Sequence, residues 1–582
     1  MVLRLASRAV TAILGLNAYH GDAAAALVID GQLVAAAEEE RFTRLKHVAG
    51  FPSHAAAWCL ADAGLSPADV DHVAMGRNPR ANLGAKVLQT ARWLRSPGYV
   101  AERLRAMRKV GTVPDDLTSA LGGPPEQAQF HRVEHHQAHV ASAFFVSPFD
   151  DAAVLTVDGF GDFASTMVAR GRGNRFEVLE RVTFPHSLGI YYTALTQWLG
   201  YPKYGDEGKV MGLAPYGDPD VHRAQMRELV RLDGLFELNL DYFVHQTRGA
   251  DMTWAAGSPV LGRLFSHRLE DAFGPPREPG GELTDHHENV AGALQAVLED
   301  SYLHLVRRAN AATGSENLCL AGGVALNAVA NGRIRPETAF DGVYVQPAAG
   351  DNGIAVGAAY YVWNQVLGRE RGFVMDHAYT GPEYSDAEIE TALASAGLEA
   401  ERLDDEALFT SVAERIADGD VVGWFQGRME FGPRALGNRS IVVDPRRPDM
   451  KDILNARIKH REPFRPFAPS ILAERTGEWF EQDYTSPFMI MVYKTRAEKR
   501  GLIPAVNHVD DTGRLQTVER NVNPRYYRLI EEFDRLTGVP VVLNTSFNEN
   551  EPIVMTPEHA VETFQKTHMD LLVLGNHLVR RS

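Results

Sequence analysis

Three histidines lie within five residues in the segment EHHQAHVASAFF, residues 134–145. On a helix, His135 and His139 are one turn apart, so both imidazoles project from the same face. That arrangement can hold a divalent metal, although two histidines at this spacing are more often structural or exposed. His136 is then expected to face elsewhere. The alanine-rich run that follows predicts a helix packed on an apolar core.

Two aspartates strengthen the case for a metal site. Asp158 ends the strand-like segment AVLTVDGFGD, and Asp351 stands in AAGDNGIAVGAA, where a helix is expected to begin. The α/β folds gather ligands at strand ends and helix starts. A set of two histidines and two aspartates with open coordination positions suits iron, zinc or manganese, and the sequence does not distinguish between them.

Glycine-bearing turns follow several of the predicted strands. The segments NAYHGDA (17–23) and DGFGDF (158–163) offer backbone donors at strand ends, and Gly322-Gly323 leaves room for a nucleotide to approach the backbone. Glycine turns are common, so one alone carries little weight. Three of them in corresponding places indicate nucleotide binding.

The elements that must position these residues follow an α/β pattern. Residues 11–17 read as a buried strand, and residues 24–30 and 32–37 as a hairpin around Asp30-Gly31. The same order of strand, glycine turn and hairpin returns in residues 152–184, which predicts two related α/β halves. An arginine-rich stretch near residues 80–130 is expected to be a solvated helical insertion, and the first residues a short extension.

A second α/β domain is expected after residues 368–384, which lose periodicity and read as a linker. We therefore expect a first domain over residues 1–367 and a second over residues 385–582. The formal charge of −16 disfavours broad binding to nucleic acid or anionic membranes, and no apolar segment is long enough to span a bilayer. Cys59 and Cys319 stand in apolar contexts, so buried thiols and a cytoplasmic location are expected.

Two loops of the second domain concentrate positive charge in an acidic chain. The segments FGPRALGNRS (431–440) and IKHREPFRPFAPS (458–470) are interrupted by prolines and cannot form long helices. Rigid loops with several cations predict a site for phosphate or pyrophosphate. Those cations are Arg434, Arg439, Lys459, Arg461 and Arg465. After the strand-like VPVVLN, Asn544 and Ser546 either orient a small polar acyl group or form an ordinary turn.

These segments together resemble the carbamoyltransferase family that includes nodulation protein U and the antibiotic-tailoring tobramycin carbamoyltransferase. The resemblance rests on AYHGDAAAALV, AAAEEERFTRLKHVAGFPS, EHHQAHVASAFF, KYGDEGKVMGLAPYG, LAGGVALN, FGPRALGNRSI, LNARIKHREPFRPFAPSIL and LNTSFNENEPIV. They occur in order over nearly the whole chain, and the stretch near 80–130 is covered least. The resemblance implies a first domain of the actin-like ATPase (ASKHA) class, related to the tRNA threonylcarbamoyl-transfer protein. It implies a second domain with the YrdC-like α/β fold of threonylcarbamoyl-AMP synthase.

The resemblance also implies roles for individual residues. The family's metal ligands correspond to His135, His139, Asp158 and Asp351, with Fe²⁺ the expected metal and Zn²⁺ or Mn²⁺ the alternatives. Residues expected near the acceptor or the activated carbamoyl group are His20, Asp22 and Lys46. Those expected to bind an adenylate in the first domain are Gly159, Gly322, Gly323 and Asn327. Those expected to bind carbamoyl phosphate and ATP in the second domain are Arg434, Lys459, Arg465, Arg514, Asn544 and Ser546.

The implied activity is an ATP-dependent O-carbamoyltransferase. Carbamoyl phosphate and ATP with Mg²⁺ would give carbamoyl-adenylate, whose carbamoyl group passes to a hydroxyl of a small natural product, as in antibiotic biosynthesis. His20 or Asp22 would take the hydroxyl proton. A sugar-kinase-like phosphotransferase and a non-enzymatic nucleotide-gated binding module are the alternatives. No nucleic-acid or membrane partner is expected, and a homodimer is one open alternative for the oligomeric state.

Overall fold

The computed structural model describes residues 10–84, 86, 113–248, 252–253 and 259–581. The expected N-terminal extension and most of the arginine-rich stretch near 80–130 lie outside these residues. The described helices of the first domain include α1 Glu39–Thr43, α2 Ser53–Asp62, α5 Val113–Leu121, α6 His135–Phe144, α7 Leu188–Trp198, α8 Glu207–Leu213, α11 His267–Phe273, α12 Asp285–Thr313, α13 Ala328–Gly332 and α15 Ile354–Tyr360.

The first sheet has the order β3-β2-β1-β4-β5. Its strands are β1 Ala12–Asn17, β2 Ala24–Ile29, β3 Gln32–Glu38, β4 His72–Met75 and β5 Gln129–Arg132. β1, β2 and β3 pair antiparallel, whereas β4 and β5 join β1 in parallel. The expected hairpin turn is present, with positive φ angles of 48° at Asp30 and 81° at Gly31.

The second sheet repeats this arrangement. Its order is β14-β13-β6-β7-β8. The strands are β6 Asp151–Gly161, β7 Ala164–Arg172, β8 Arg175–Thr183, β13 Asn317–Ala321 and β14 Gly342–Val345. Again three antiparallel strands are extended by two parallel ones. The prediction of two related α/β halves is therefore confirmed.

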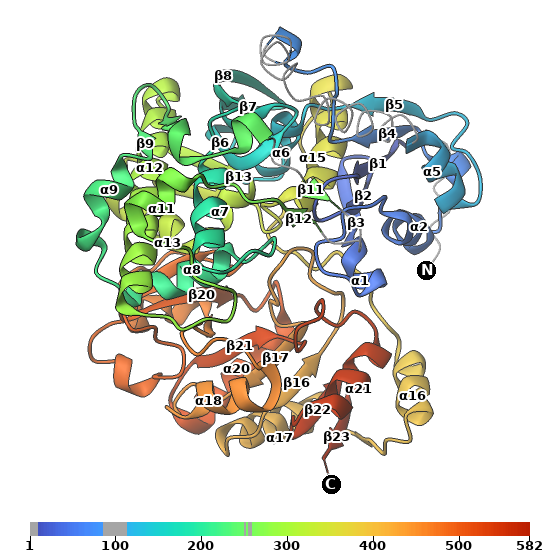
Figure 1. Cartoon of the computed structure of the whole chain (residues 1–582). Coiled ribbons are helices and arrows are strands. Elements are labelled where there is room, and N and C mark those ends of the chain that lie inside the picture. The colour runs from blue at the N-terminus through green and yellow to red at the C-terminus, as the bar shows by residue number, and fades with distance from the viewer. Residues whose placement is uncertain (1–9, 85, 87–112, 249–251, 254–258, 582) are drawn as a thin grey trace.

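Helices α6 and α15 lie between the two sheets (Figure 1). Small residues allow this close packing, because a Cβ on Gly357 would lie 1.8 Å from the Ala138 carbonyl oxygen. A Cβ on Gly15 of β1 would likewise lie 2.0 Å from the Ala355 oxygen. The 3-10 turn Asp351–Gly353, which leads into α15, is thereby held beside the histidine face of α6.

The third sheet has nine strands in the order β15-β23-β22-β16-β17-β21-β18-β20-β19. They are β15 Glu401–Arg402, β16 Val422–Phe425, β17 Arg439–Val443, β18 Ala468–Leu472, β19 Met491–Lys494, β20 Thr512–Val518, β21 Val541–Ser546, β22 Leu571–Leu574 and β23 His577–Arg580. The helices packed with it include α16 Asp386–Ser395, α17 Asp405–Ala417, α20 Pro524–Thr537 and α21 Pro557–Lys566. In Figure 1 this sheet lies below the two five-stranded sheets. The domain boundaries and the YrdC-like assignment stay predictions.

Two further expectations concern the core and the membrane. Cys59 and Cys319 are both buried as free thiols, as predicted. None of the helices in the described part of the chain combines the length and apolarity needed to cross a membrane.

Candidate active site

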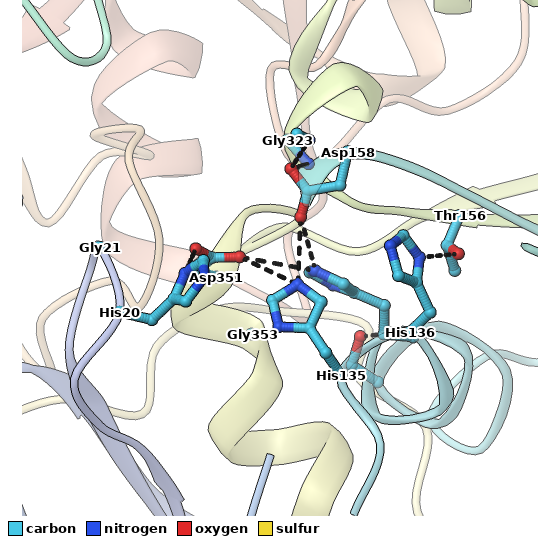
Figure 2. A network of polar contacts seen from close by, with 12 residues as sticks. His20, Gly21, His135, His136, Thr156, Asp158, Gly323, Asp351 and Gly353 are labelled. Atoms are coloured by element: carbon cyan, nitrogen blue, oxygen red, sulfur yellow. Dashed lines mark hydrogen bonds and ion pairs between the residues drawn. The ribbon is translucent and has the colours of Figure 1, made fainter. Parts of the chain in front are cut away.

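Four predicted side chains meet between the two halves of the first domain (Figure 2). Helix α6 begins at His135, where the Glu134 carboxylate accepts a hydrogen bond from the Gln137 amide. The Nε2 atoms of His135 and His139 lie 3.3 Å and 3.0 Å from Asp158 Oδ2. The same two nitrogens lie 3.5 Å and 3.6 Å from Asp351 Oδ1. The predicted His₂Asp₂ set therefore converges, with its ligand atoms all within 4.8 Å of one another.

The chemistry of this cluster fits a divalent metal. Two imidazole nitrogens and two carboxylate oxygens face a common centre, and Asp351 Oδ1 is buried with no hydrogen-bond partner among the described residues. Burial alone would raise the pKa of Asp158, but hydrogen bonds from His135 and His139 hold it well below its usual range. His136 points away, with Nδ1 2.7 Å from Thr156 Oγ1, as expected.

The glycine turns shape the cluster. A Cβ on Gly161 would lie 2.0 Å from the His135 ring, so the ring occupies space that only glycine leaves. The amides of Gly159 and Gly323 donate to Asp158 Oδ1 at 2.7 Å and 3.2 Å. Gly322 adopts a φ of 92° against the backbone of β6. The three glycines predicted to bind an adenylate thus lie together beside Asp158.

Asn327, the fourth residue predicted to bind an adenylate, caps helix α13. Its Oδ1 accepts from the Ala330 amide, and its side-chain amide makes two reciprocal hydrogen bonds of 3.0 Å with Gln295. Both polar atoms of the Asn327 side chain are therefore already hydrogen-bonded within the protein, and its predicted role in adenylate binding stays a prediction.

The candidate proton acceptors each have a partner. His20 Nδ1 makes a short hydrogen bond to Asp351 Oδ2. Burial lowers the pKa of His20, but the charge of Asp351 outweighs it, and the net shift is upward. Asp22 Oδ1 lies 2.7 Å from His47 Nδ1, and Glu40 Oε2 accepts from the His47 amide at 2.8 Å.

His47 was not among the predicted site residues. Burial lowers its pKa, but the neighbouring Asp22 carboxylate more than offsets this and raises the pKa to about 9. His47 is therefore a cation at neutral pH. The signal in the sequence was its place directly after Lys46 in RLKHVAG.

Lys46 is influenced by charges of both domains. Burial lowers its pKa most, the Glu40 carboxylate of its own domain opposes this, and Arg465 of the second domain lowers it further. Arg44, two residues earlier, donates to the carbonyl oxygens of Ile553 and Pro552 at 2.8 Å and 2.7 Å. The segment that contains Lys46 and His47 is thus anchored on the second domain.

The predicted arginines of the second domain surround one another. Burial and repulsion from Arg465 lower the pKa of Arg434 to about 10 and that of Arg461 to about 9. Burial, and then repulsion from Arg434, Arg461 and Arg465, hold the pKa of Arg514 well below its usual range. Within the described chain, no hydrogen-bond partner meets the buried Nε atoms of Arg434, Arg461 and Arg514. Arg465 forms an ion pair with Glu462 at 3.7 Å. Neighbouring cations with buried nitrogens that lack acceptors fit a polyanion site.

Lys459 and Asn544 lie in the same region. The Lys459 ammonium donates to the carbonyl oxygens of Ser546 and Asn548 at 2.6 Å and 2.7 Å, and to Asn548 Oδ1 at 2.8 Å. Asn544 donates to Gln516 Oε1 at 2.9 Å, while its buried Oδ1 meets no donor from the described residues. Asn548 was missed, although it stands two residues after Ser546 in NTSFNEN.

Arg439, named among the loop cations, has a structural role. It is fully buried, donates to the Gln426 carbonyl at 2.6 Å, and lies 3.6 Å over the Phe425 ring. Its guanidinium donates to backbone carbonyls and lies over an aromatic ring, so it contributes no free donor to the arginine cluster.

Comparison with known proteins decides the family. A family model described as "Carbamoyltransferase N-terminus" matches residues 12–112 and 125–360, and one described as "Carbamoyltransferase C-terminus" matches residues 413–581. The chain belongs to the carbamoyltransferase family. It is accordingly a transferase that acts on a carbamoyl donor and an acceptor.

Relatives in this family cover most of the chain. The protein sll1178 of Synechocystis is 43% identical over 98% of this chain and 97% of its own. Nodulation protein NolNO of Sinorhizobium fredii is 41% identical over 97% of this chain and 80% of its own. Nodulation protein U of Rhizobium tropici is 31% identical over 92% of this chain and 90% of its own.

Solved structures resemble this carbamoyltransferase more distantly. Component A of the (R)-2-hydroxyglutaryl-CoA dehydratase of Acidaminococcus fermentans is 13% identical, with a TM-score of 0.31, over 60% of this chain and 97% of that one. HypF of T. kodakarensis is 12% identical, with a TM-score of 0.29, over 62% of this chain and 48% of that one.

Proposed function

We propose that this carbamoyltransferase is ATP-dependent and acts through carbamoyl-adenylate on a hydroxyl of a small natural product. A carbamoyl group is a poor electrophile because its nitrogen donates electron density to the carbonyl. An anhydride with AMP supplies a better leaving group. The observation that carries the proposal is the arginine cluster of the second domain, whose buried nitrogens meet no acceptor in the described chain and so favour binding of a polyanion, in the same chain as the His₂Asp₂ cluster.

The proposed reaction balances with one water. Water converts carbamoyl phosphate to carbamate and phosphate. A carbamate oxygen attacks the α-phosphorus of ATP, and pyrophosphate leaves. The acceptor hydroxyl then attacks the carbonyl carbon, the bond from that carbon to the AMP oxygen breaks, and the hydroxyl proton passes to a base. The products are the carbamate ester, AMP, pyrophosphate and phosphate.

The first half of this sequence is assigned to the second domain. Arg434, Arg461, Arg465 and Arg514 would bind the phosphate groups of carbamoyl phosphate and ATP, whose charge offsets the repulsion between the guanidinium groups. Asn544 Oδ1, which is buried without a donor from the described chain, would accept from the carbamoyl NH₂ group. Lys459 would hold the Ser546–Asn548 turn against the acyl group as a point charge.

Transfer to the acceptor is assigned to the first domain. His20 and Asp22 are the two candidates for the base that takes the hydroxyl proton. The His47 cation, with Lys46, would face the negative charge that develops on the leaving AMP. A divalent metal held by His135, His139, Asp158 and Asp351 would supply Lewis acidity and offset phosphate charge.

Incubation with ATP, labelled carbamoyl phosphate and a panel of hydroxylated natural products, read by mass, tests the proposal. We expect a gain of one carbamoyl mass on one acceptor, with AMP and pyrophosphate formed in equal amounts. Lys459→Ala and His139→Ala should abolish the product. Lys566→Ala and His54→Ala serve as matched controls because their side chains are 62% and 64% exposed. Formation of ADP in place of AMP would refute the adenylate.

A further inference from the structure

A buried ion pair of the first domain holds one peptide of the second. Glu38, at the end of β3, and Arg41, in α1, are only 3% and 2% exposed. Glu38 Oε1 accepts a hydrogen bond from the Gly432 amide at 2.7 Å, and Arg41 Nη2 donates to the Gly432 carbonyl oxygen at 2.7 Å. Glu38 Oε2 lies 3.5 Å from Arg41 Nε. Both polar atoms of this one glycine are therefore fixed by the neighbouring domain.

The same carboxylate oxygen also contacts the loop that carries a candidate metal ligand. Glu38 Oε1 also accepts from Asn352 Nδ2 at 3.2 Å. Asn352 directly follows Asp351 in the chain, and Gly432 precedes Arg434 by two residues. One buried oxygen thus bonds to the residue next to a candidate metal ligand and to the loop that carries an arginine of the polyanion cluster.

Gly432 is fitted to this position. Its φ of 117° is one that other residues rarely adopt, and an added Cβ would lie 3.0 Å from the Pro347 carbonyl oxygen of the first domain. Pro433 follows it and stiffens the connection to Arg434. Movement at Gly432 is therefore passed directly to Arg434.

A buried carboxylate and guanidinium carry a desolvation cost that a purely apolar contact would avoid, so such pairs are weak evidence for stability and better suited to fixing geometry. Elsewhere the two domains are joined by a more exposed pair, Asp62 and Arg428, whose charged atoms lie 2.9 Å apart and whose side chains are 29% and 32% exposed. The other side-chain hydrogen bonds of Arg428 go to the carbonyl oxygens of Gly381, Val34 and Thr380. Among the described residues the pair therefore forms no hydrogen bond or ion pair with either cluster, which makes it a natural control.

We propose that Glu38 and Arg41 are positioning residues that keep the Arg434 loop in register with the Asp351 loop, so that carbamoyl-adenylate passes between the two sites without being lost to water. This inference rests on the function proposed above. Neither residue touches a substrate in this role. Their effect is exerted through Gly432 and Asn352.

Two measurements on the full-length protein distinguish an effect on the alignment of the two loops from an effect on adenylate formation. Neither measurement needs the acceptor. Exchange of labelled pyrophosphate into ATP, with carbamoyl phosphate present, reports adenylate formation. Release of AMP from ATP and carbamoyl phosphate alone reports loss of the adenylate to water. In Glu38→Ala and Arg41→Met we expect AMP release to rise at least about tenfold relative to exchange, because small displacements between reacting groups have effects of this size or more.

Three further variants sharpen the test. Glu38→Gln keeps an acceptor oxygen for Gly432 and Asn352 and should stay close to the wild type. Gly432→Ala disturbs the same peptide without changing the charge of Glu38 or Arg41. It should raise the ratio of AMP release to exchange as Glu38→Ala does. Asp62→Asn removes an interdomain ion pair away from both sites and should leave the ratio of AMP release to exchange unchanged.

The outcomes distinguish this inference from the function on which it rests. A wild-type protein without pyrophosphate exchange would refute the proposed function. With exchange present in the wild type, the positioning role is refuted if the ratio of AMP release to exchange stays unchanged in Glu38→Ala and Gly432→Ala, whether or not both rates fall. It is equally refuted if this ratio rises as much in Asp62→Asn as in those two variants.

Discussion

The pair formed by Asp22 and His47 predicts a pH-dependent contribution to stability. The pKa of His47 is raised from 6.5 to about 9 in the folded protein, because the Asp22 carboxylate outweighs the effect of burial. A raised pKa in the folded state stabilises the protein fully below the unfolded value near 6.5, and this stabilisation is lost as the pH rises through 9. Replacing Asp22 by asparagine should remove it while leaving a hydrogen-bond acceptor in place.

The structure sets the size of the effect. The full shift in pKa corresponds to an upper limit of about 3 kcal/mol. The side chains of His47 and Asp22 are 32% and 21% exposed, so solvent screens their interaction. We therefore expect Asp22→Asn to lower the free energy of unfolding by about 1–2 kcal/mol at pH 6 and by close to zero at pH 10.

Urea unfolding of both proteins at several pH values between 5.5 and 10 measures this difference, since the other titrating groups cancel. A double-mutant cycle with His47→Gln isolates the pair, because the two changes should then not add. Selective labelling of the histidines with NMR detection gives the pKa of His47 directly. A difference between the proteins that is constant over this pH range, or that grows toward pH 10, would refute the electrostatic reasoning.

Three other perturbations have defined outcomes. Arg514→Met should raise the free energy of unfolding of the ligand-free protein by about 1–3 kcal/mol, because it removes a cation repelled by its neighbours. Pyrophosphate should raise the thermal midpoint of the wild type but not that of this variant. A variant less stable than the wild type would contradict the repulsion between these arginines. Gly161→Ala places a carbon 2.0 Å from the His135 ring and should weaken Zn²⁺ binding in equilibrium dialysis about 10–100-fold, whereas Gly208→Ala in α8, where the described chain leaves open space, should not. Chelation should lower the thermal midpoint of the wild type but not that of His139→Ala, and equal sensitivity would argue against the four ligands.

Local pattern was enough to predict the parts of the candidate site that follow one another along the chain. The four-residue spacing of His135 and His139 places both on one face of α6 wherever that helix packs. Asp158 was expected to end a strand, but β6 continues through Gly161, and only its register against β7 shifts after Val157. The place of the aspartate beside a glycine turn was readable from the sequence, whereas the strand end was placed three residues too early. The hairpin at Asp30-Gly31 and the repeat of the two halves were predicted on the same basis.

Contacts between distant segments were not predictable in this way. His47 and Asn548 were missed because nothing in RLKHVAG or NTSFNEN states which residues will face them. Arg434 and Arg439, the first residue of β17, are only five positions apart. Arg434 lies near other arginines, whereas Arg439 is satisfied by backbone carbonyls and Phe425. Both residues are arginines in the same short segment, and only the surrounding fold gives them different contacts.

The sequence by itself determined the duplicated α/β architecture, the histidine face of α6 and the concentration of arginine in the proline-rich loops, since periodicity, turn residues and charge act over a few residues. The tertiary structure decided which of these groups share a centre. Glu38 and Gly432 lie 394 positions apart and are joined by a 2.7 Å hydrogen bond. Such a contact depends on how whole sheets and helices pack, because burial and hydrogen-bond satisfaction are settled only when all of the elements are in place.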